Sequence, residues 1–135
     1  MFNKKKTSSI TVILNSYNRH NILDEQLNAI KKQSIPVDDI WLWSNRGDIP
    51  IHQREDIKAA YSNHNYKYFG RFAFAMLAQT DFVAFFDDDT IPGTDWFKSC
   101  LEYMDIHNGI LGTTGIKIEK KSYFPHEKIG WNGTK

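Results

Sequence analysis

Residues 82–90 read Phe-Val-Ala-Phe-Phe-Asp-Asp-Asp-Thr, so that a short apolar strand runs directly into three consecutive carboxylates. Adjacent carboxylates repel one another and are costly to hold together beside a core. A divalent cation such as Mg²⁺ or Mn²⁺ would offset that repulsion, and these ions often combine one or two carboxylates with phosphate oxygens. The segment therefore predicts a metal at the end of a strand, with a phosphorylated ligand completing its coordination. The alternative is a solvated acidic turn before a helix.

At 135 residues the chain is at most one domain, spanning residues 1–135, with a flexible terminus expected at residues 1–8. The net charge of +1 gives no general attraction to nucleic acid, so no nucleic-acid partner is expected. No apolar stretch approaches the roughly 20 residues that cross a bilayer, and there is no apolar signal-peptide core. The single cysteine, Cys100, excludes an internal disulfide framework and favours a cytoplasmic location.

Strand and helix patterns alternate along the chain, which predicts an α/β fold with a mostly parallel sheet and right-handed crossovers. Residues 10–14 are mostly β-branched and nearly continuous in apolar character, as in a strand buried on both faces. The predicted strands are residues 10–14, 40–43, 57–61, 82–86 and 110–113, and the predicted helices are residues 21–33, 71–79 and 95–107.

Polar clusters follow three of these strands, at residues 15–19, 44–48 and 87–89. In a parallel sheet the carboxyl ends of the strands share one edge, and ligands bind there, where the strand order reverses. We therefore expect the three clusters to converge, although they are far apart in sequence. Their convergence would favour a nucleotide-phosphate site.

These residues resemble a glycosyltransferase of the GT-A fold, a Rossmann-like α/β architecture, and are similar to family 2 of those enzymes. Residues 12–19, Val-Ile-Leu-Asn-Ser-Tyr-Asn-Arg, resemble the family's opening strand, and residues 86–89 resemble its strand ending in a D-x-D metal motif. Residues 70–72, Gly-Arg-Phe, lie where the family carries a nucleotide-contacting Arg. The Arg-Phe pair and the Asp-Asp-Asp-Thr run also resemble exostosin-like transferases. The resemblance covers residues 10 to 115.

The resemblance implies a transferase that moves a sugar from a nucleoside-diphosphate sugar, UDP-linked first, to the hydroxyl of a carbohydrate or glycan acceptor, using Mn²⁺ or Mg²⁺. Tyr17 would lie against the base, and Arg71 would neutralise the diphosphate. Asp87 would contact the ribose or the sugar, and Asp89 would bind the metal. The full set implied for the nucleotide sugar is Asn15, Ser16, Tyr17, Arg19, Asn45, Arg71, Asp87 and Asp88, with Asp87 and Asp89 for the metal.

The chain departs from the family pattern in two places. Family 2 enzymes usually have acidic residues after the second strand, one of which reads uracil, whereas residues 44–47 are Ser-Asn-Arg-Gly. Asn45 could still pair with a base through its amide. GT-A domains also continue well past the D-x-D strand, so we expect the C-terminal acceptor half to be missing, and a further domain could follow. The general base is unassigned, with His126 and Glu127 as weak candidates.

Two other functions would use the same residues. A non-catalytic nucleotide-sugar-binding module would need another domain for chemistry. A nucleotidyltransferase also uses carboxylates and a metal, but it would carry a glycine-rich basic loop after the first strand. Residues 15–19 contain no glycine, which disfavours that alternative.

Overall fold

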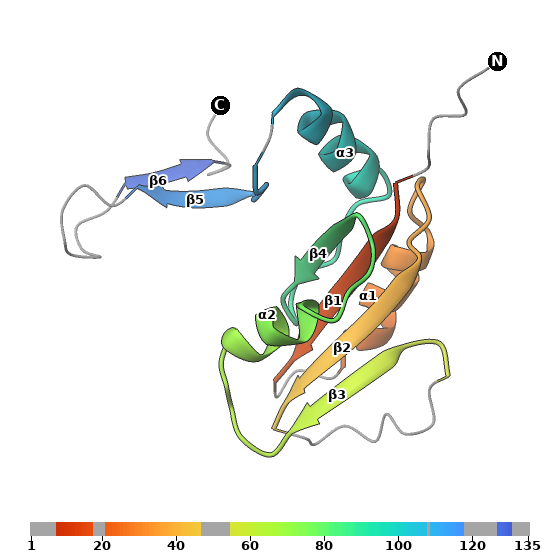
Figure 1. Cartoon of the computed structure of the whole chain (residues 1–135), viewed down its shortest axis with the longest axis vertical. Coiled ribbons are helices and arrows are strands. Elements are labelled where there is room, and N and C mark those ends of the chain that lie inside the picture. Colours follow the sequence, from red (N-terminus) through yellow and green to blue (C-terminus); the bar gives the residue numbers. More distant parts are fainter. Residues whose placement is uncertain (1–7, 18–20, 47–54, 108, 118–126, 131–135) are drawn as a thin grey trace. The chain divides into compact units, whose positions relative to one another are not determined.

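The computed structural model describes residues 8–17, 21–46, 55–107, 109–117 and 127–130. They form two compact parts, within residues 1–98 and 99–135, which are described separately. The elements of the first part are β1 (Ile10–Ser16), α1 (Leu23–Lys31), β2 (Asp39–Asn45), β3 (Lys58–Ser62), α2 (Phe69–Ala75), β4 (Phe82–Phe86) and the start of α3 (Trp96–Ile106). Figure 1 shows this succession of strands and helices along the chain.

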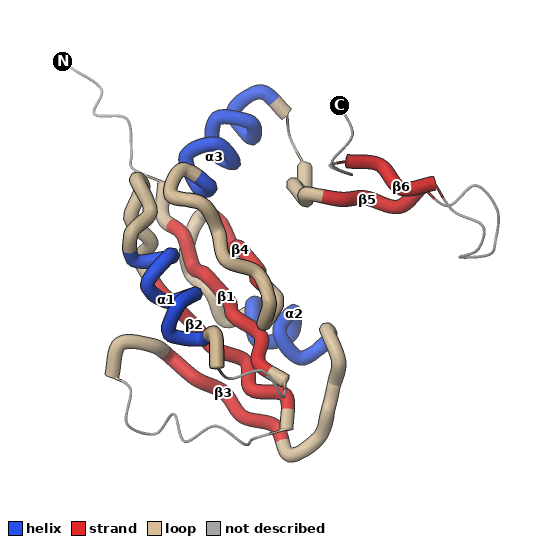
Figure 2. The backbone as a smooth tube through the Cα atoms, turned by 180° about the vertical axis from the view of Figure 1, so that it is seen from behind, coloured by secondary structure: helices blue, strands red, loops and turns tan. Residues whose placement is uncertain are grey.

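The first part is a parallel α/β sheet with strand order β3-β2-β1-β4. Helix α1 covers one face of this sheet and α2 covers the opposite face, as the two opposed views show (Figures 1 and 2). This arrangement confirms the predicted fold class, a GT-A, Rossmann-like sheet flanked by helices.

Strand β1 lies at the centre of the core, because it pairs with β2 on one side and with β4 on the other. Val12, Ile13 and Leu14 have no exposed surface, although their side chains point to alternate faces of the sheet. Burial on both faces was predicted from the continuous apolar run of this strand, and it is confirmed.

Large aromatic side chains fill the layer between the sheet and α2. The ring of Phe74, on α2, lies 4.8 Å from that of Trp41 and 6.1 Å from that of Trp43. Phe72 packs edge-on against Phe85 of β4, with ring centroids 4.8 Å apart. The strand alternation therefore assigns the face that carries Trp41, Trp43 and Phe85 to α2, and the face that carries Phe86 to α1.

The order of the strands reverses between β1 and β4. From β1 the chain adds β2 and β3 on one side, and then crosses back through α2 to place β4 on the other side of β1. Helix α2 contacts both β1 and β2 on this return. The carboxyl ends of β1 and β4 thus form the switch point at which open parallel sheets bind ligands.

The second part contains a two-stranded antiparallel ribbon of β5 (Thr114–Lys117) and β6 (Glu127–Gly130), with Thr114 opposite Gly130. The strand predicted at residues 110–113 is wrong, because regular pairing begins only at Thr114. In the part of the chain that the structure describes, the longest helix is α3 with 11 residues, and no helix is long and apolar enough to cross a membrane.

Candidate functional site

The acidic run lies at the switch point and contacts the loop that follows β1. The backbone N–H of Tyr17 donates to Oδ2 of Asp88 over 3.3 Å, across the junction between β1 and β4. This contact confirms the predicted convergence of the polar clusters at residues 15–19 and 87–89. Asp87 and Asp89 are exposed, whereas Asp88 and Tyr17 are partly buried.

A cation from α2 lies against the first carboxylate of the run. Nη1 of Arg71 pairs with Oδ1 of Asp87. The Arg71 side chain is only 14% exposed, whereas that of Asp87 is 59% exposed. A largely buried cation is therefore paired with a solvent-exposed carboxylate. The pairing follows from the strand alternation, because Phe86 points to the α1 face and Asp87 therefore points to the α2 face.

Two buried polar atoms near this edge have no hydrogen-bond partner among the described residues. They are Oδ1 of Asn15, near the end of β1, and Nε of Arg71. Asn15 lies in register with Trp43 and so faces α2, the helix that carries Arg71. Unsatisfied buried polar atoms are rare in native proteins, and each calls for an explanation such as strain, a catalytic role or a bound water or ion. Ser16 is buried in the strand and lies opposite Ser44.

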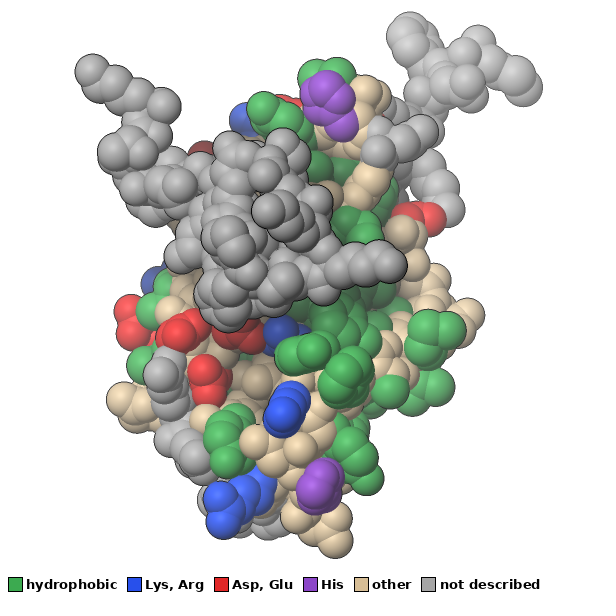
Figure 3. Space-filling view, turned by 90° about the vertical axis from the view of Figure 1, so that its left-hand side faces the viewer, with side chains coloured by type: hydrophobic (Ala, Val, Ile, Leu, Met, Phe, Trp, Pro, Cys, Tyr) green, Lys and Arg blue, Asp and Glu red, His purple; other side chains and the backbone are tan. Residues whose placement is uncertain are grey.

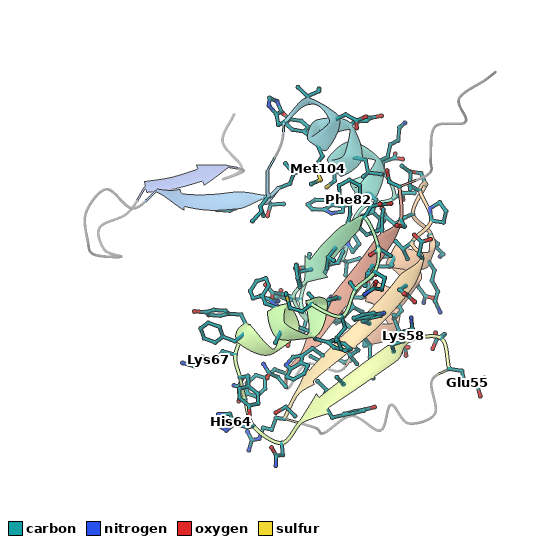
Figure 4. The ribbon with its side chains drawn as sticks, in the orientation of Figure 1. Glu55, Lys58, His64, Lys67, Phe82 and Met104 are labelled. Atoms are coloured by element: carbon teal, nitrogen blue, oxygen red, sulfur yellow. The ribbon has the colours of Figure 1, made fainter. Side chains whose placement is uncertain are left out.

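Asn45 has a different environment from the one that a base-pairing amide would need. The residue is 3% exposed. Its Oδ1 accepts from Nε1 of Trp43 over 3.1 Å and from the backbone N–H of Tyr66 over 3.0 Å. Its Nδ2 donates to the carbonyl oxygen of Lys67 over 2.6 Å. The amide thus ties the end of β2 to the connection between β3 and α2, in which His64 and Lys67 lie (Figure 4).

The sequence interpretation missed a glutamine that holds the acidic turn from the other face. Nε2 of Gln26, on α1, donates to the carbonyl oxygen of Asp87 over 2.6 Å and to that of Thr90 over 2.7 Å. A glutamine in an amphipathic helix is usually read as a solvent-facing residue. The only signal in the sequence is that Gln26 falls on the same helical face as Leu23 and Ile30.

Three predicted site residues cannot be placed by their side chains. Arg19 and His126 lie outside the described residues, and Glu127 begins β6 without a described side chain. Cys100 is partly buried on α3, and burial raises the pKa of its thiol, which therefore stays protonated at neutral pH.

A separate cavity lies at the amino ends of β2 and β3, at the opposite edge of the sheet. Its charged lining includes two ion pairs, Lys31 Nζ to Asp56 Oδ2 at 2.6 Å and Lys58 Nζ to Asp39 Oδ1 at 2.7 Å. Both lysines of the lining are thus paired within the protein. The cavity therefore offers an anionic ligand no unpaired cation among its lining residues.

Within the described residues, no three His, Cys, Asp or Glu side chains form a group that could hold a metal by themselves. Any cation at the acidic turn would therefore need further ligands from a bound molecule. Figure 3 shows acidic side chains lying next to basic ones on one face of the molecule, beside a broad hydrophobic area.

Comparisons with known proteins agree with this architecture. A search of curated proteins found no match to the chain. The sequence profile of the family described as "Glycosyl transferase family 2" matches residues 11–134, which include both sheet strands of the switch point and the acidic turn. That match supports glycosyltransferase activity in general terms, with a nucleotide-sugar donor and an acceptor as substrates. The chain belongs to glycosyl transferase family 2.

Proposed function

We propose that this protein transfers a sugar from a nucleoside-diphosphate sugar, UDP-linked first, to an acceptor hydroxyl, and that the reaction depends on Mn²⁺ or Mg²⁺. The observation that carries the proposal is the contact between Tyr17 and Asp88 at the switch point, with Arg71 paired to Asp87 beside it. These two contacts bring the loop after β1, the D-x-D carboxylates and the buried guanidinium of Arg71 together at one edge of the sheet.

The proposed donor site uses the residues at the ends of β1, α2 and β4. Tyr17 would lie against the base, and Asn15 would offer its unpartnered Oδ1 to the nucleoside. Arg71 would turn its guanidinium to the diphosphate, because a largely buried cation is most stable with an anionic partner. Asn45 is left out of the proposed contacts, because protein groups already engage its amide.

The carboxylates present fit a hard divalent cation that is shared with phosphate. Mg²⁺ and Mn²⁺ take oxygen ligands and often use only one or two carboxylates, with substrate phosphates completing the shell. Asp87 and Asp89 are the exposed acids of the turn and would hold the ion, with Asp88 fixed by the Tyr17 N–H. When bound, the metal would offset the negative charge of the departing diphosphate.

The protein groups would act by charge and position. Arg71 would stabilise negative charge on the leaving diphosphate, and its burial would strengthen that effect, because fewer waters screen it. Asp87, released from Arg71, would face the ribose or the sugar. The proton of the acceptor hydroxyl would have to pass to a base, for which His126 and Glu127 are the candidates.

Calorimetry with UDP, with and without Mn²⁺, tests the donor site. The wild-type protein should bind UDP more tightly with Mn²⁺, and Asp89→Asn should lose that increment. Asp95→Asn serves as the control, since Asp95 is an exposed acid outside the turn. If Mn²⁺ leaves UDP binding unchanged in the wild type, the proposed donor site is wrong. Hydrolysis of UDP-sugars by the bound protein then separates an enzyme from a module that only binds nucleotide sugars.

A further inference from the structure

One side chain of α1 closes the turn that carries the carboxylates. The two hydrogens of the Gln26 amide go to the carbonyl oxygens of Asp87 and Thr90, which bracket Asp88 and Asp89. The backbone N–H of Thr90 also donates to the carbonyl oxygen of Asp87 over 3.1 Å. The carbonyl of Asp87 therefore accepts twice, once from within the turn and once from α1.

Gln26 is a polar residue at a buried position of α1, and its hydrogen bonds to the turn explain why it is tolerated there. The residue is 2% exposed, in a position where an apolar residue would normally pack. A buried amide is costly unless it is hydrogen-bonded, and both hydrogens of this one are used on the turn. Its neighbours on the buried face of α1 are all apolar: Leu23, Leu27 and Ile30.

A second glutamine provides an internal comparison. Gln33 is also buried and follows the end of α1, but it holds the segment after the turn. Its Nε2 donates to the carbonyl oxygen of Gly93 over 2.7 Å, and its Oε1 accepts from the backbone N–H of Phe97 over 3.3 Å. Gln33 thus holds the start of α3 in place. Of the two glutamines, only Gln26 bonds to the turn that contains the acidic residues.

We propose that Gln26 is a positioning residue that fixes Asp88 and Asp89 in the geometry needed for metal-dependent binding of the donor diphosphate. The inference rests on the proposed function, because it assigns Gln26 to the same site. Without the amide, the carbonyl oxygen of Thr90 would lose the Gln26 donor and that of Asp87 would keep only the Thr90 N–H, so the turn would reorient toward water or other donors. Residues that support metal ligands in this way typically change metal affinity by about 10- to 100-fold when they are replaced.

The test compares Gln26→Met with Gln33→Met, because methionine keeps the length and approximate volume of glutamine but cannot donate. UDP affinity is measured calorimetrically with and without Mn²⁺, and urea unfolding is measured for both variants. We expect the two variants to lose similar stability. Gln26→Met should reduce the Mn²⁺-dependent gain in UDP affinity by roughly tenfold or more, whereas Gln33→Met should reduce it less than about threefold.

A second measurement does not depend on the ligand. Hydrogen exchange of the Thr90 amide, followed by NMR without nucleotide or metal, reports directly on the closed turn. In Gln26→Met this amide should exchange about tenfold faster than in the wild type, because loss of one net hydrogen bond has roughly that effect on opening. In Gln33→Met it should stay near the wild-type rate.

The outcomes separate the two proposals. Equal losses of the Mn²⁺-dependent gain in both variants, or no loss in Gln26→Met, would overturn the positioning role. If the wild type shows no Mn²⁺-dependent binding, the donor-site proposal fails, and Thr90 exchange alone decides whether Gln26 orders the turn. Should Gln26→Met fail to fold, Gln26→Asn keeps the amide, withdraws it by one methylene, and is measured in the same way.

Discussion

A Cβ atom added to Gly70 would lie 2.2 Å from Cε2 of the Trp43 indole. Helix α2 therefore rests on the ring of Trp43 at a point where only a hydrogen atom fits. Arg71 is the next residue of the same helix, so this contact sets the height of its guanidinium above the sheet. The packing of a glycine against an indole thus helps to place the cation of the candidate site.

Gly70→Ala should destabilise the fold, because the added methyl group must displace either the indole or the helix. We expect the free energy of unfolding to fall by about 1–3 kcal/mol, the usual cost of overpacking a core. Urea unfolding followed by tryptophan fluorescence measures the change. Gly93→Ala is the control, since no atom lies within 4 Å of its added Cβ. Helix propensity alone favours Ala over Gly, so a stabilised Gly70→Ala protein would contradict the close contact.

Arg71→Gln should weaken UDP binding by roughly tenfold or more, because a charge-assisted hydrogen bond to phosphate is lost. Arg71→Lys should retain part of the affinity, since it keeps the charge but not the planar fork of the guanidinium. Lys32→Gln is the matched control for net charge, because Lys32 is exposed beyond the end of α1. Equal affinities of the Arg71→Gln and Lys32→Gln proteins in calorimetry would show that Arg71 does not contact the nucleotide.

Asp87→Asn should affect UDP binding in opposite directions with and without Mn²⁺. Without the metal, removal of one negative charge and release of Arg71 should tighten binding by a few-fold, since charges at this exposed edge interact by about 1 kcal/mol. With Mn²⁺, loss of a ligand should weaken binding. Asp88→Asn is the comparison, because an Asn oxygen can still accept from the Tyr17 N–H. A change in the same direction under both conditions would exclude Asp87 as a metal ligand.

Asn45→Ala should lower stability without changing which base is preferred. The substitution leaves the Trp43 indole N–H, the Tyr66 N–H and the Lys67 carbonyl without their partner, which should cost about 3 kcal/mol. Urea unfolding measures the loss, and calorimetry compares UDP with CDP and ADP below the unfolding transition. An altered ranking of the three nucleotides, with stability unchanged, would return Asn45 to the list of base contacts.

The sequence predicted the sheet best where strand boundaries coincide with strong local signals. Strand β4 was predicted at its observed residues, because Asp81 and Asp87 flank an unbroken apolar run. Strand β1 extends to Ser16, beyond its apolar residues, because pairing with Ser44 continues the ladder. Helix α2 spans Phe69–Ala75 instead of the predicted residues 71–79, since a segment in which nearly every residue is apolar has little periodicity to fix its bounds.

Long-range pairing explains what the sequence could not predict. The ribbon of β5 and β6 depends on Thr114 meeting Gly130, and no local pattern near residue 114 indicates that partner. In the site, the carboxylates could be assigned to the end of β4 from their position alone. The roles of Asn45 and Gln26 could not be predicted. The residue type alone does not show whether a side-chain amide will hydrogen-bond to the backbone or to a ligand.

The place of β4 beside β1 has a consequence for the order of folding. Ile10 pairs with Phe82, so the chain must close a long loop before the two ends of the switch point meet. Such non-local pairing is slow to form. A growing chain that has not yet supplied Asp87 lacks the acidic half of the site. By mass action, a nucleotide bound at the proposed site would therefore stabilise only the chain in which β4 has joined the sheet.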